Sequence, residues 1–420
     1  MFKKIVIIFI IALAFASALF IYRGYFNNTR STVSQVAKAT KSPEPGTPEY
    51  KKEQSSKWFE VDSIRFKELF SKGKYADANK LIQSYSKDFP KNKQIIEYKN
   101  LVRNFMNPII YKGPVEHIFF HPLMTYNLVK ENRKGFDEFM VTIDEFNRTI
   151  EEFYKKDYVL IDIHLLYGTR ENGTVYKKVL KIPKGKKPLV FSIDDYNFLQ
   201  YMKENGCAQG LKIVDGKVLS YVKDKNGNKI FSDDKEITPI MENFVLEHPD
   251  FSYLGAKGVI ALEGYEGALG FSTDMLSWEN YPGVLAEARS VVASMKQSGW
   301  TFASHSYGHN SPAHMSYGSF VADANKWHKE VEAVVGKTDV YIYPFGERIE
   351  RTDPKFKYLQ KLGFRMFCDI WGSHPSIDFR ETNIRMSRRN IDGIELKTHR
   401  LSNIIDDSKI PSPVRPWYNK

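Results

Sequence analysis

The chain has 420 residues, enough for two domains or for one barrel-sized domain with an appendage. Its composition is ordinary and globular, and with only two cysteines, Cys207 and Cys368, a disulfide scaffold is not expected. The formal net charge of +11 leaves two interpretations open: a solvated surface, or attraction to acidic polymers and lipid head groups. The lysines are scattered along the chain, which fits a solvated surface, and a chain exported from the cell would meet acidic wall polymers and lipid head groups first, so we expect no nucleic-acid partner.

Residues 1–26 have the pattern of a membrane anchor. Two lysines precede an uncharged apolar run from Ile5 to Tyr22, which Arg23 closes, and about this many apolar residues can just span a bilayer as a helix. A small-x-small motif ending at Ala18 also fits a signal peptidase site, but apolar residues continue past it, which favours an uncleaved anchor. We therefore expect a single-pass protein of the bacterial cell membrane with its body on the extracytoplasmic side, or a secreted protein if the chain is cut near Ala18.

Two short regions follow the anchor. Residues 27–51 are rich in Ser, Thr, Lys, Pro and Gly, which predicts a flexible linker. Residues 52–106 show helical patterns separated at Gly73 and stopped at Pro90, which predict a helical hairpin. This hairpin resembles one tetratricopeptide unit, but no second copy follows, so a spacer or a packing cap is expected rather than a peptide receptor.

From residue 107 to 404 short apolar runs alternate with amphipathic segments. The predicted strands are 158–164, 188–193, 257–263, 300–304, 339–344 and 364–368, and the predicted helices are 136–156, 282–299, 319–336 and 354–363. This alternation predicts an α/β fold whose parallel sheet, with crossover helices, forms a partial barrel. Residues 211–232, with two Gly-containing turns, interrupt the rhythm as an inserted β-hairpin, and residues 405–420 are expected to form a C-terminal tail.

Polar side chains gather where the predicted strands end. In α/β barrels the loops at the carboxyl ends of the strands converge, so chemistry collects there. The residues found at these ends are Asp194, Asp195, His305, His309, Pro344, Phe345, Gly346, Asp369 and Trp371.

A metal site explains the acids and histidines best. His305 and His309 are four residues apart and, with one carboxylate, make a three-ligand site that leaves a position open for water. Ser306 follows the first histidine, so a general base must come from elsewhere, and Asp194, next to the ligand Asp195, is the natural supplier. A glycosidase would need two carboxylates about 5–10 Å apart across a sugar, which adjacent residues achieve poorly. Taken singly, each motif is more often a turn or a surface feature; the joint pattern is the stronger signal.

The stretches "FSIDD", "SHSYGH" and "YPFG", in this order, resemble the first three motifs of the polysaccharide deacetylase family, the NodB homology domain of carbohydrate esterase family four. The resemblance covers residues 188–399 and implies a distorted (β/α) barrel. It also implies that Asp194 is the catalytic base and that Asp195, His305 and His309 hold a divalent metal, with zinc the expected ion. The substrate-binding residues implied are Tyr343, Pro344, Phe345, whose amide would help to bind the oxyanion, Asp369, and Trp371 as an apolar wall.

Two departures from the family pattern stand out. The third motif usually opens with an arginine that steadies the base, and none stands there; the arginines considered as replacements are Arg365, Arg388 and Arg389. The last motif, a leucine followed by a histidine acting as general acid, is matched only loosely by Leu396 and His399, and a surface histidine is the alternative. The histidines without a motif, for which packing or surface roles are expected, are His121, His164, His314 and His328.

These patterns together predict a metal-dependent hydrolase that removes N-acetyl groups from an extracytoplasmic glycan, either peptidoglycan or a poly-N-acetylglucosamine-type polymer. Three alternatives stay open: a non-catalytic glycan-binding relative, an esterase acting on O-acetyl groups, and a scaffold protein built around the hairpin of residues 52–106.

Overall fold

The computed structural model describes residues 43–124, 133–224, 226–370 and 375–418. The predicted anchor, its possible cleavage site and Trp371 lie outside these ranges, and within them no helix is both long and apolar enough to cross a bilayer. The chain divides into two units, Met1–Glu60 and Val61–Lys420. In the first unit, α2 (Pro48–Lys57) begins inside the predicted linker, because the Thr47 side chain accepts a hydrogen bond from the Tyr50 N–H and Pro48 suits the first helical turn.

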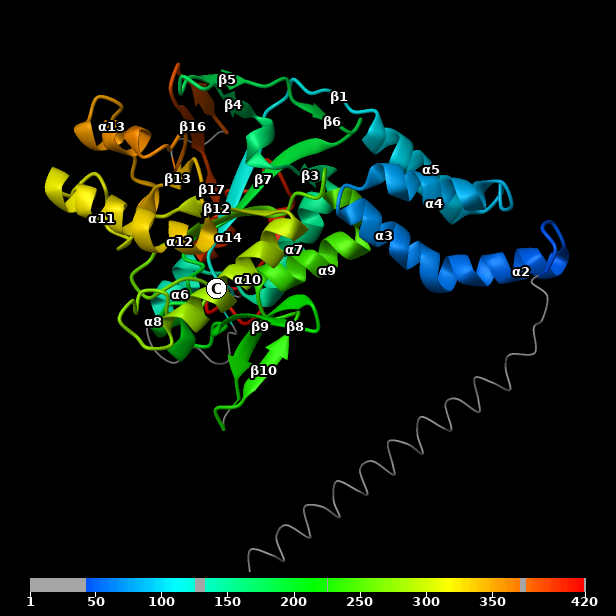
Figure 1. Ribbon diagram of the computed structural model, residues 1–420, viewed down its shortest axis with the longest axis horizontal. Coiled ribbons are helices and arrows are strands. Elements are labelled where there is room, and N and C mark those ends of the chain that lie inside the picture. The colour runs from blue at the N-terminus through cyan, green and yellow to red at the C-terminus, as the bar shows by residue number, and fades with distance from the viewer. Residues whose placement is uncertain (1–42, 125–132, 225, 371–374, 419–420) are drawn as a thin grey trace, which may run out of the picture. The chain divides into compact units, whose positions relative to one another are not determined.

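The second unit is built around one large sheet, to which the described residues contribute ten strands (Figure 1). These are β2 (Glu116–Phe120), β3 (Tyr158–Leu160), β7 (Lys187–Ile193), β11 (Gly258–Leu262), β12 (Trp300–Ser304), β13 (Val340–Ile342), β14 (Met366–Asp369), β15 (Ile377–Phe379), β16 (Ile384–Ser387) and β17 (Arg389–Asn390). The order is β15-β16-β14-β13-β12-β11-β7-β2-β17, with β3 beside β7, and every pairing is parallel except that of β15.

The sheet curls because its two ends share one stretch of chain. Strand β16 pairs with β14 and strand β17 pairs with β2, yet Arg388 alone separates β16 from β17. One extended segment therefore joins both ends of the parallel run. This confirms an α/β fold with a curled sheet, and all six strands predicted from the sequence are present.

Helices lie between the strands along the chain, except for the last helix, which follows the last strand. They are α6 (Arg133–Phe139), α7 (Ile143–Lys155), α8 (Gln200–Glu204), α9 (Ile237–Glu247), α10 (Tyr281–Ser298), α11 (Tyr317–Glu330), α12 (Glu332–Val335), α13 (Pro354–Lys361) and α14 (Gly393–Lys397). The predicted helix 136–156 is divided in two, because Thr142 starts a new helix through a capping box with Glu145. The chain after residue 404 packs on this region: the buried Arg415 guanidinium pairs with the Glu145 carboxylate.

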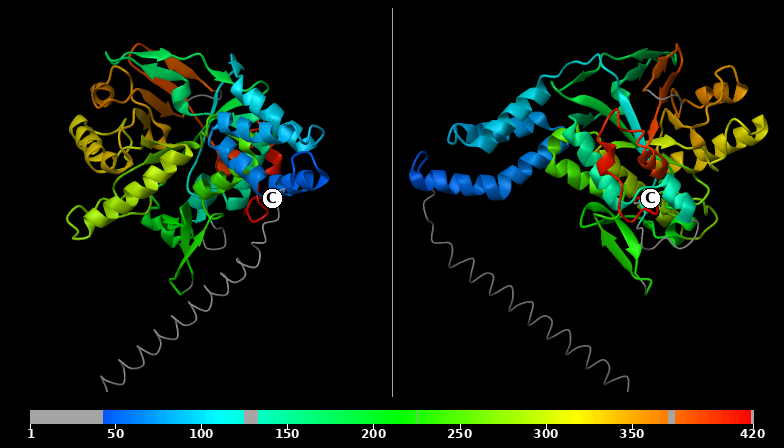
Figure 2. Two further views of the ribbon diagram at one scale, coloured as in Figure 1. Left: turned by 45° about the vertical axis from the view of Figure 1, so that its right-hand side comes forward. Right: turned by 180° about the vertical axis from the view of Figure 1, so that it is seen from behind.

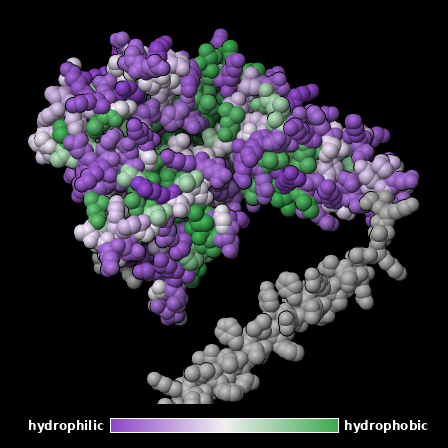
Figure 3. All heavy atoms as spheres, in the orientation of Figure 1, coloured by the Kyte–Doolittle hydropathy of each residue, from purple (hydrophilic) through white to green (hydrophobic). Residues whose placement is uncertain are grey.

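Two appendages of the second unit follow the sequence pattern. Strands β8 (Gly210–Val214), β9 (Lys217–Lys223) and β10 (Lys229–Ser232) form an antiparallel sheet that projects from the rest of the unit in Figures 1 and 2, which confirms the inserted hairpin. Small two-stranded sheets join β1 (Ile109–Ile110) to β6 (Lys181–Ile182), and β4 (Tyr167–Thr169) to β5 (Val175–Lys177). Hydrophilic side chains cover most of the face shown in Figure 3, interrupted by apolar groups.

Helices α3 (Ser63–Ser71), α4 (Tyr75–Ser86) and α5 (Lys93–Met106) occupy the segment predicted as a hairpin. The hydroxyl oxygen of Tyr75 accepts a hydrogen bond of 2.7 Å from the Leu254 N–H, and its ring stacks on Tyr253. This segment is therefore docked on the loop after α9 by specific contacts, as a packing cap would be.

Candidate metal and catalytic site

Side chains that can bind a metal meet at the carboxyl ends of β7, β11 and β12, which are neighbours in the sheet. Among the described residues, Asp195, Glu263, His305 and His309 each place one ligand atom within 4.8 Å of the others. Three of the four were predicted. Glu263 was missed, although its signal was present: an acid directly after a buried apolar strand, as with Asp194.

The two imidazoles converge on one carboxylate oxygen. Nε2 of His305 lies 3.5 Å and Nε2 of His309 lies 3.4 Å from Oδ1 of Asp195. His305 Nδ1 lies 2.9 Å from the Ile342 carbonyl oxygen, an arrangement in which the protonated Nδ1 donates and the Nε2 lone pair points to the cluster. The rings are thus oriented as metal ligands.

Buried carboxylate oxygens make this cluster a candidate cation site. Apart from the contact between these two carboxylates, Oδ1 of Asp195 and both carboxylate oxygens of Glu263 have no hydrogen-bond partner among the described residues. Buried carboxylates are otherwise paired, hydrogen-bonded or bound to a metal. Two imidazoles with carboxylate oxygens suit zinc and the divalent ions from manganese to nickel, so the residues present fit the metal that the sequence predicts.

Burial affects the protonation of the His305 ring and of the two carboxylates in different ways. Burial lowers the pKa of His305 to about 4, so its ring is neutral at neutral pH, the form that binds metals. Burial, and then the charge of Asp195, raise the pKa of Glu263 well above its ordinary value. Burial also acts to raise the pKa of Asp195, but contact with Glu263 and the imidazole of His309 outweighs it and holds that pKa below its usual range.

Asp194 is held by Arg388. The guanidinium donates from Nη1 to Oδ1 and from Nη2 to Oδ2, both at 2.8 Å, and both side chains are buried. Burial alone would raise the pKa of Asp194, but the Arg388 charge keeps it below its usual value, so the carboxylate is ionised at neutral pH. Of the other arginines considered from the sequence, Arg365 bonds to backbone carbonyls and Arg389 pairs with Glu116.

The loop that carries both histidines is fixed by hydrogen bonds to a carboxylate of α11 (Tyr317–Glu330). Ser306 and His309 have positive φ values of 60° and 49°, which cost free energy unless the surroundings impose them. The Asp323 carboxylate of α11 imposes this turn, because it accepts the N–H groups of Tyr307 and Gly308 at 2.8 Å each.

Another histidine reaches the site, and it is not the one expected. His121 follows β2, the neighbour of β7; its Nε2 lies 4.0 Å from Oδ2 of Asp195, and its side chain is 21% exposed. His399 has a side chain that is 55% exposed and pairs with Asp407 at 3.2 Å; in the part of the chain that the structure describes, no interaction joins it to the cluster.

The residues expected to bind substrate lie in different surroundings. Tyr343 is fully buried between Tyr341 and Phe367, and Pro344 is also buried. Phe345 is 60% exposed, has a φ of +58°, and packs its ring edge against His309 at 4.5 Å between centroids. Of these three, only Phe345 has an exposed side chain, and its ring contacts a histidine of the cluster.

Asp369, the remaining substrate-binding candidate within the described residues, is buried at the end of β14. Its carboxylate lies 4.0 Å from Nη1 of Arg348. Burial raises its pKa to about 6 despite the nearby arginines.

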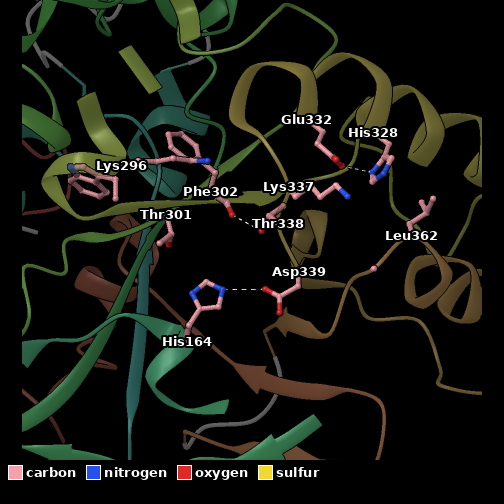
Figure 4. Close-up of a pocket in the computed structure, with 12 residues that line it drawn as sticks. His164, Lys296, Thr301, Phe302, His328, Glu332, Lys337, Thr338, Asp339 and Leu362 are labelled. Atoms are coloured by element: carbon pink, nitrogen blue, oxygen red, sulfur yellow. Dashed lines mark hydrogen bonds and ion pairs between the residues drawn. The ribbon is translucent and has the colours of Figure 1, made fainter. Parts of the chain in front are cut away.

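A pocket of about 650 Å³ lies elsewhere, near the amino ends of β12 and β13 (Figure 4). In it Nε2 of His164 lies 3.1 Å from the Asp339 carboxylate, and His328 pairs with Glu332. Because Asp195, Glu263 and His305 follow the opposite ends of their strands, this pocket is separate from the metal-binding cluster.

The model of the family described as polysaccharide deacetylase matches residues 272–367, a stretch that contains both histidines of the cluster. No curated protein sequence matches the chain. Among solved structures, the chain is similar to the Streptococcus pyogenes deacetylase PplD in complex with acetate, with 12% identity, 71% of this chain and 100% of that chain covered, and a TM-score of 0.40. It is also similar to a de-N-acetylase from Aggregatibacter actinomycetemcomitans, with 14% identity, 67% and 96% coverage, and a TM-score of 0.37. Both likenesses are distant.

Proposed function

We propose that the protein is a metal-dependent deacetylase that removes N-acetyl groups from an extracytoplasmic polysaccharide of the peptidoglycan or poly-N-acetylglucosamine type. The observation that carries the proposal is the buried pair of Asp194 and Arg388 beside a cluster that fits a divalent cation. The family match over residues 272–367 supports a polysaccharide as the substrate class.

The residues divide the chemistry among them. A divalent ion, expected to be zinc and held by Asp195, His305 and His309, would polarise the acetamide carbonyl and lower the pKa of water. Asp194, ionised and fixed by Arg388, accepts the proton of the attacking water. The backbone N–H of Phe345 is assigned to the oxyanion.

Protonation of the leaving amine needs an acid near the cluster. His121 is the assigned group, because it lies beside Asp195 and is partly open to solvent, whereas His399 pairs with Asp407. The products are acetate and a glucosamine-type sugar, which is cationic at neutral pH.

The test is acetate release from chito-oligosaccharides, with acetylated xylan as the comparison that detects an O-acetyl esterase. Asp194→Asn keeps the shape of the side chain but cannot accept the proton, so release should fall by roughly 10²-fold or more while bound metal is retained. Unchanged acetate release in this variant would show that Asp194 is not the base. A wild type that binds metal and glycan but releases no acetate would identify a glycan-binding relative instead.

The location of the protein is a separate part of the proposal. The apolar run from Ile5 to Tyr22 supports a membrane-anchored protein whose body faces the extracytoplasmic side, where the glycan is found. The protein should then be found in the membrane fraction, and protease added to intact cells should degrade its body. Full protection of the body from protease would contradict this location.

A further inference from the structure

Glu263 is the residue of the cluster that the proposed mechanism does not use. It is 0% exposed, and apart from the contact with the Asp195 carboxylate neither of its carboxylate oxygens has a hydrogen-bond partner among the described residues. One of its oxygens belongs to the set of ligand atoms that lie within 4.8 Å of one another. A buried carboxylate without partners is costly unless a cation neutralises it.

The backbone of Glu263 is fixed by two hydrogen bonds to one buried side chain. The Asn197 side chain accepts a hydrogen bond of 3.0 Å from the Glu263 N–H and donates one of 2.9 Å to the Glu263 carbonyl. Asn197 is itself fully buried and lies in the loop that carries Asp195. A single amide therefore clamps the two acid-bearing loops together, which fixes the direction from which the Glu263 side chain leaves the backbone.

We propose that Glu263 is a fourth protein ligand, so that the centre has two histidines and two carboxylates instead of the three ligands that the sequence motifs imply. The inference rests on the metal dependence in the proposed function. Two carboxylates neutralise the charge of a divalent ion, which accounts for both acids being buried together.

A fourth ligand changes which ion suits the site. Four protein ligands fill a tetrahedral zinc site and close it to water, as in structural zinc centres. A hydrolytic centre must keep a position open, so the ion has to accept five or six nitrogen and oxygen ligands. Cobalt, manganese and ferrous iron do so readily with this donor set.

The competing role for Glu263 is that of a positioning residue, protonated and donating a hydrogen bond to Asp195. Glu263→Gln separates the two roles, because a glutamine amide mimics the protonated carboxyl but is a poor metal ligand. The matched control is Glu236→Gln, which replaces another fully buried glutamate, one outside the cluster that caps α9.

The experiment loads the metal-free full-length chain with Co²⁺ and measures its dissociation constant by competition with a chromophoric chelator, together with the visible absorption of the bound ion. We expect weak absorption typical of five or six ligands in the wild type. In Glu263→Gln we expect a changed spectrum and Co²⁺ affinity lower by at least tenfold, with the loss for Zn²⁺ smaller. Glu236→Gln should match the wild type.

Two outcomes would overturn the proposal. Glu263→Gln with wild-type affinity and spectrum would make Glu263 a positioning residue. The intense absorption of tetrahedral Co²⁺ in the wild type, together with a water on the ion that exchanges with solvent, would mean three protein ligands and exclude Glu263, and this measurement stands even if the variant does not fold. Neither readout depends on acetate release, so an inactive protein with the expected spectrum would refute the proposed function and leave this inference in place.

Discussion

Arg388 supplies the positive charge that an arginine at the start of the third motif would provide, although it comes from a distant part of the chain. Its position follows from the fold, because it is the residue between β16 and β17, where the extended segment leaves one end of the sheet and joins the other. Its guanidinium meets Asp194 with two parallel hydrogen bonds. A planar, two-pronged donor of this kind fixes the direction of a carboxylate as well as its charge.

Arg388→Lys should therefore impair the base without removing the charge. A lysine ammonium is a single point donor, so the pKa of Asp194 should rise and its orientation should loosen. Since the base must be ionised, the acidic limb of the pH profile of kcat/KM should move to higher pH, and kcat should fall by roughly 10-fold or more. The control is Arg389→Lys, because the neighbouring Arg389 pairs with Glu116 and not with Asp194. An acidic limb that stays in place would show that Arg388 does not tune the base.

The two histidines offered as the general acid make opposite predictions. His121→Gln should lower kcat by about 10²-fold, because His121 lies beside Asp195. His399→Gln should leave kcat near wild type, since its partner is Asp407. Steady-state kinetics decides between them, and the reverse pattern would restore the assignment of His399.

At the scale of elements, the contact between α3–α4 and the loop after α9 depends on two glycines. Gly73 has a φ of +70°, and a Cβ added there would lie 2.6 Å from the backbone carbon of Leu254. Gly255 has a φ of +82° and would place a Cβ 3.0 Å from the Lys72 backbone. The two turns thus approach backbone to backbone, and Tyr75 hydrogen-bonds across the contact.

Gly73→Ala should lower the free energy of unfolding by more than the cost of placing alanine at a positive φ. Gly185→Ala is the matched control, because Gly185 has a φ of +87° but no heavy atom within 4 Å of an added Cβ. We expect Gly185→Ala to lower the free energy of unfolding by about 1 kcal/mol, and Gly73→Ala to lower it by about 1–3 kcal/mol more through the clash with Leu254. Urea denaturation measures both values. Equal losses of unfolding free energy in the two variants would mean that the turn can move away from Leu254 and that the contact is not tightly packed.

At the scale of the whole molecule, the sequence predicted the parts of the site that follow strongly apolar strands. Strand β7 and strand β12 are apolar runs, so the acids and histidines after them could be placed at one end of a sheet. Glu263 follows an equally clear strand, β11, but a single acid has no partner motif in the sequence to distinguish it from a surface residue.

The rest of the site depends on strands that carry polar residues. Strand β2 contains Glu116 and His117, and β16 and β17 contain arginine, serine and asparagine, so their apolar pattern is weak. These are the strands that join the ends of the sheet. Because their pairing could not be predicted, neither Arg388 beside Asp194 nor His121 beside Asp195 could be placed from the sequence.

A buried acid outside the metal-binding cluster makes the stability of the whole fold depend on pH. Glu236 caps α9 and accepts the N–H groups of Ile237 and Leu123. Burial raises its pKa from 4.5 to about 8, although these hydrogen bonds act in the opposite direction. In the unfolded chain it ionises near its ordinary value. Between these two values the folded state therefore holds a proton that the unfolded state has lost.

The contribution of Glu236 to stability should consequently be complete below about pH 4.5 and be lost as the pH rises toward 8. The glutamine of Glu236→Gln cannot ionise. Between pH 5 and pH 8 the free energy of unfolding of the wild type should therefore fall, relative to that of the variant, by an amount on the order of a few kcal/mol. Urea denaturation with a chelator present keeps the pH dependence of metal binding out of the comparison. Parallel curves for the two proteins would show that Glu236 is already ionised in the folded state, with its charge compensated by the N–H groups of Ile237 and Leu123.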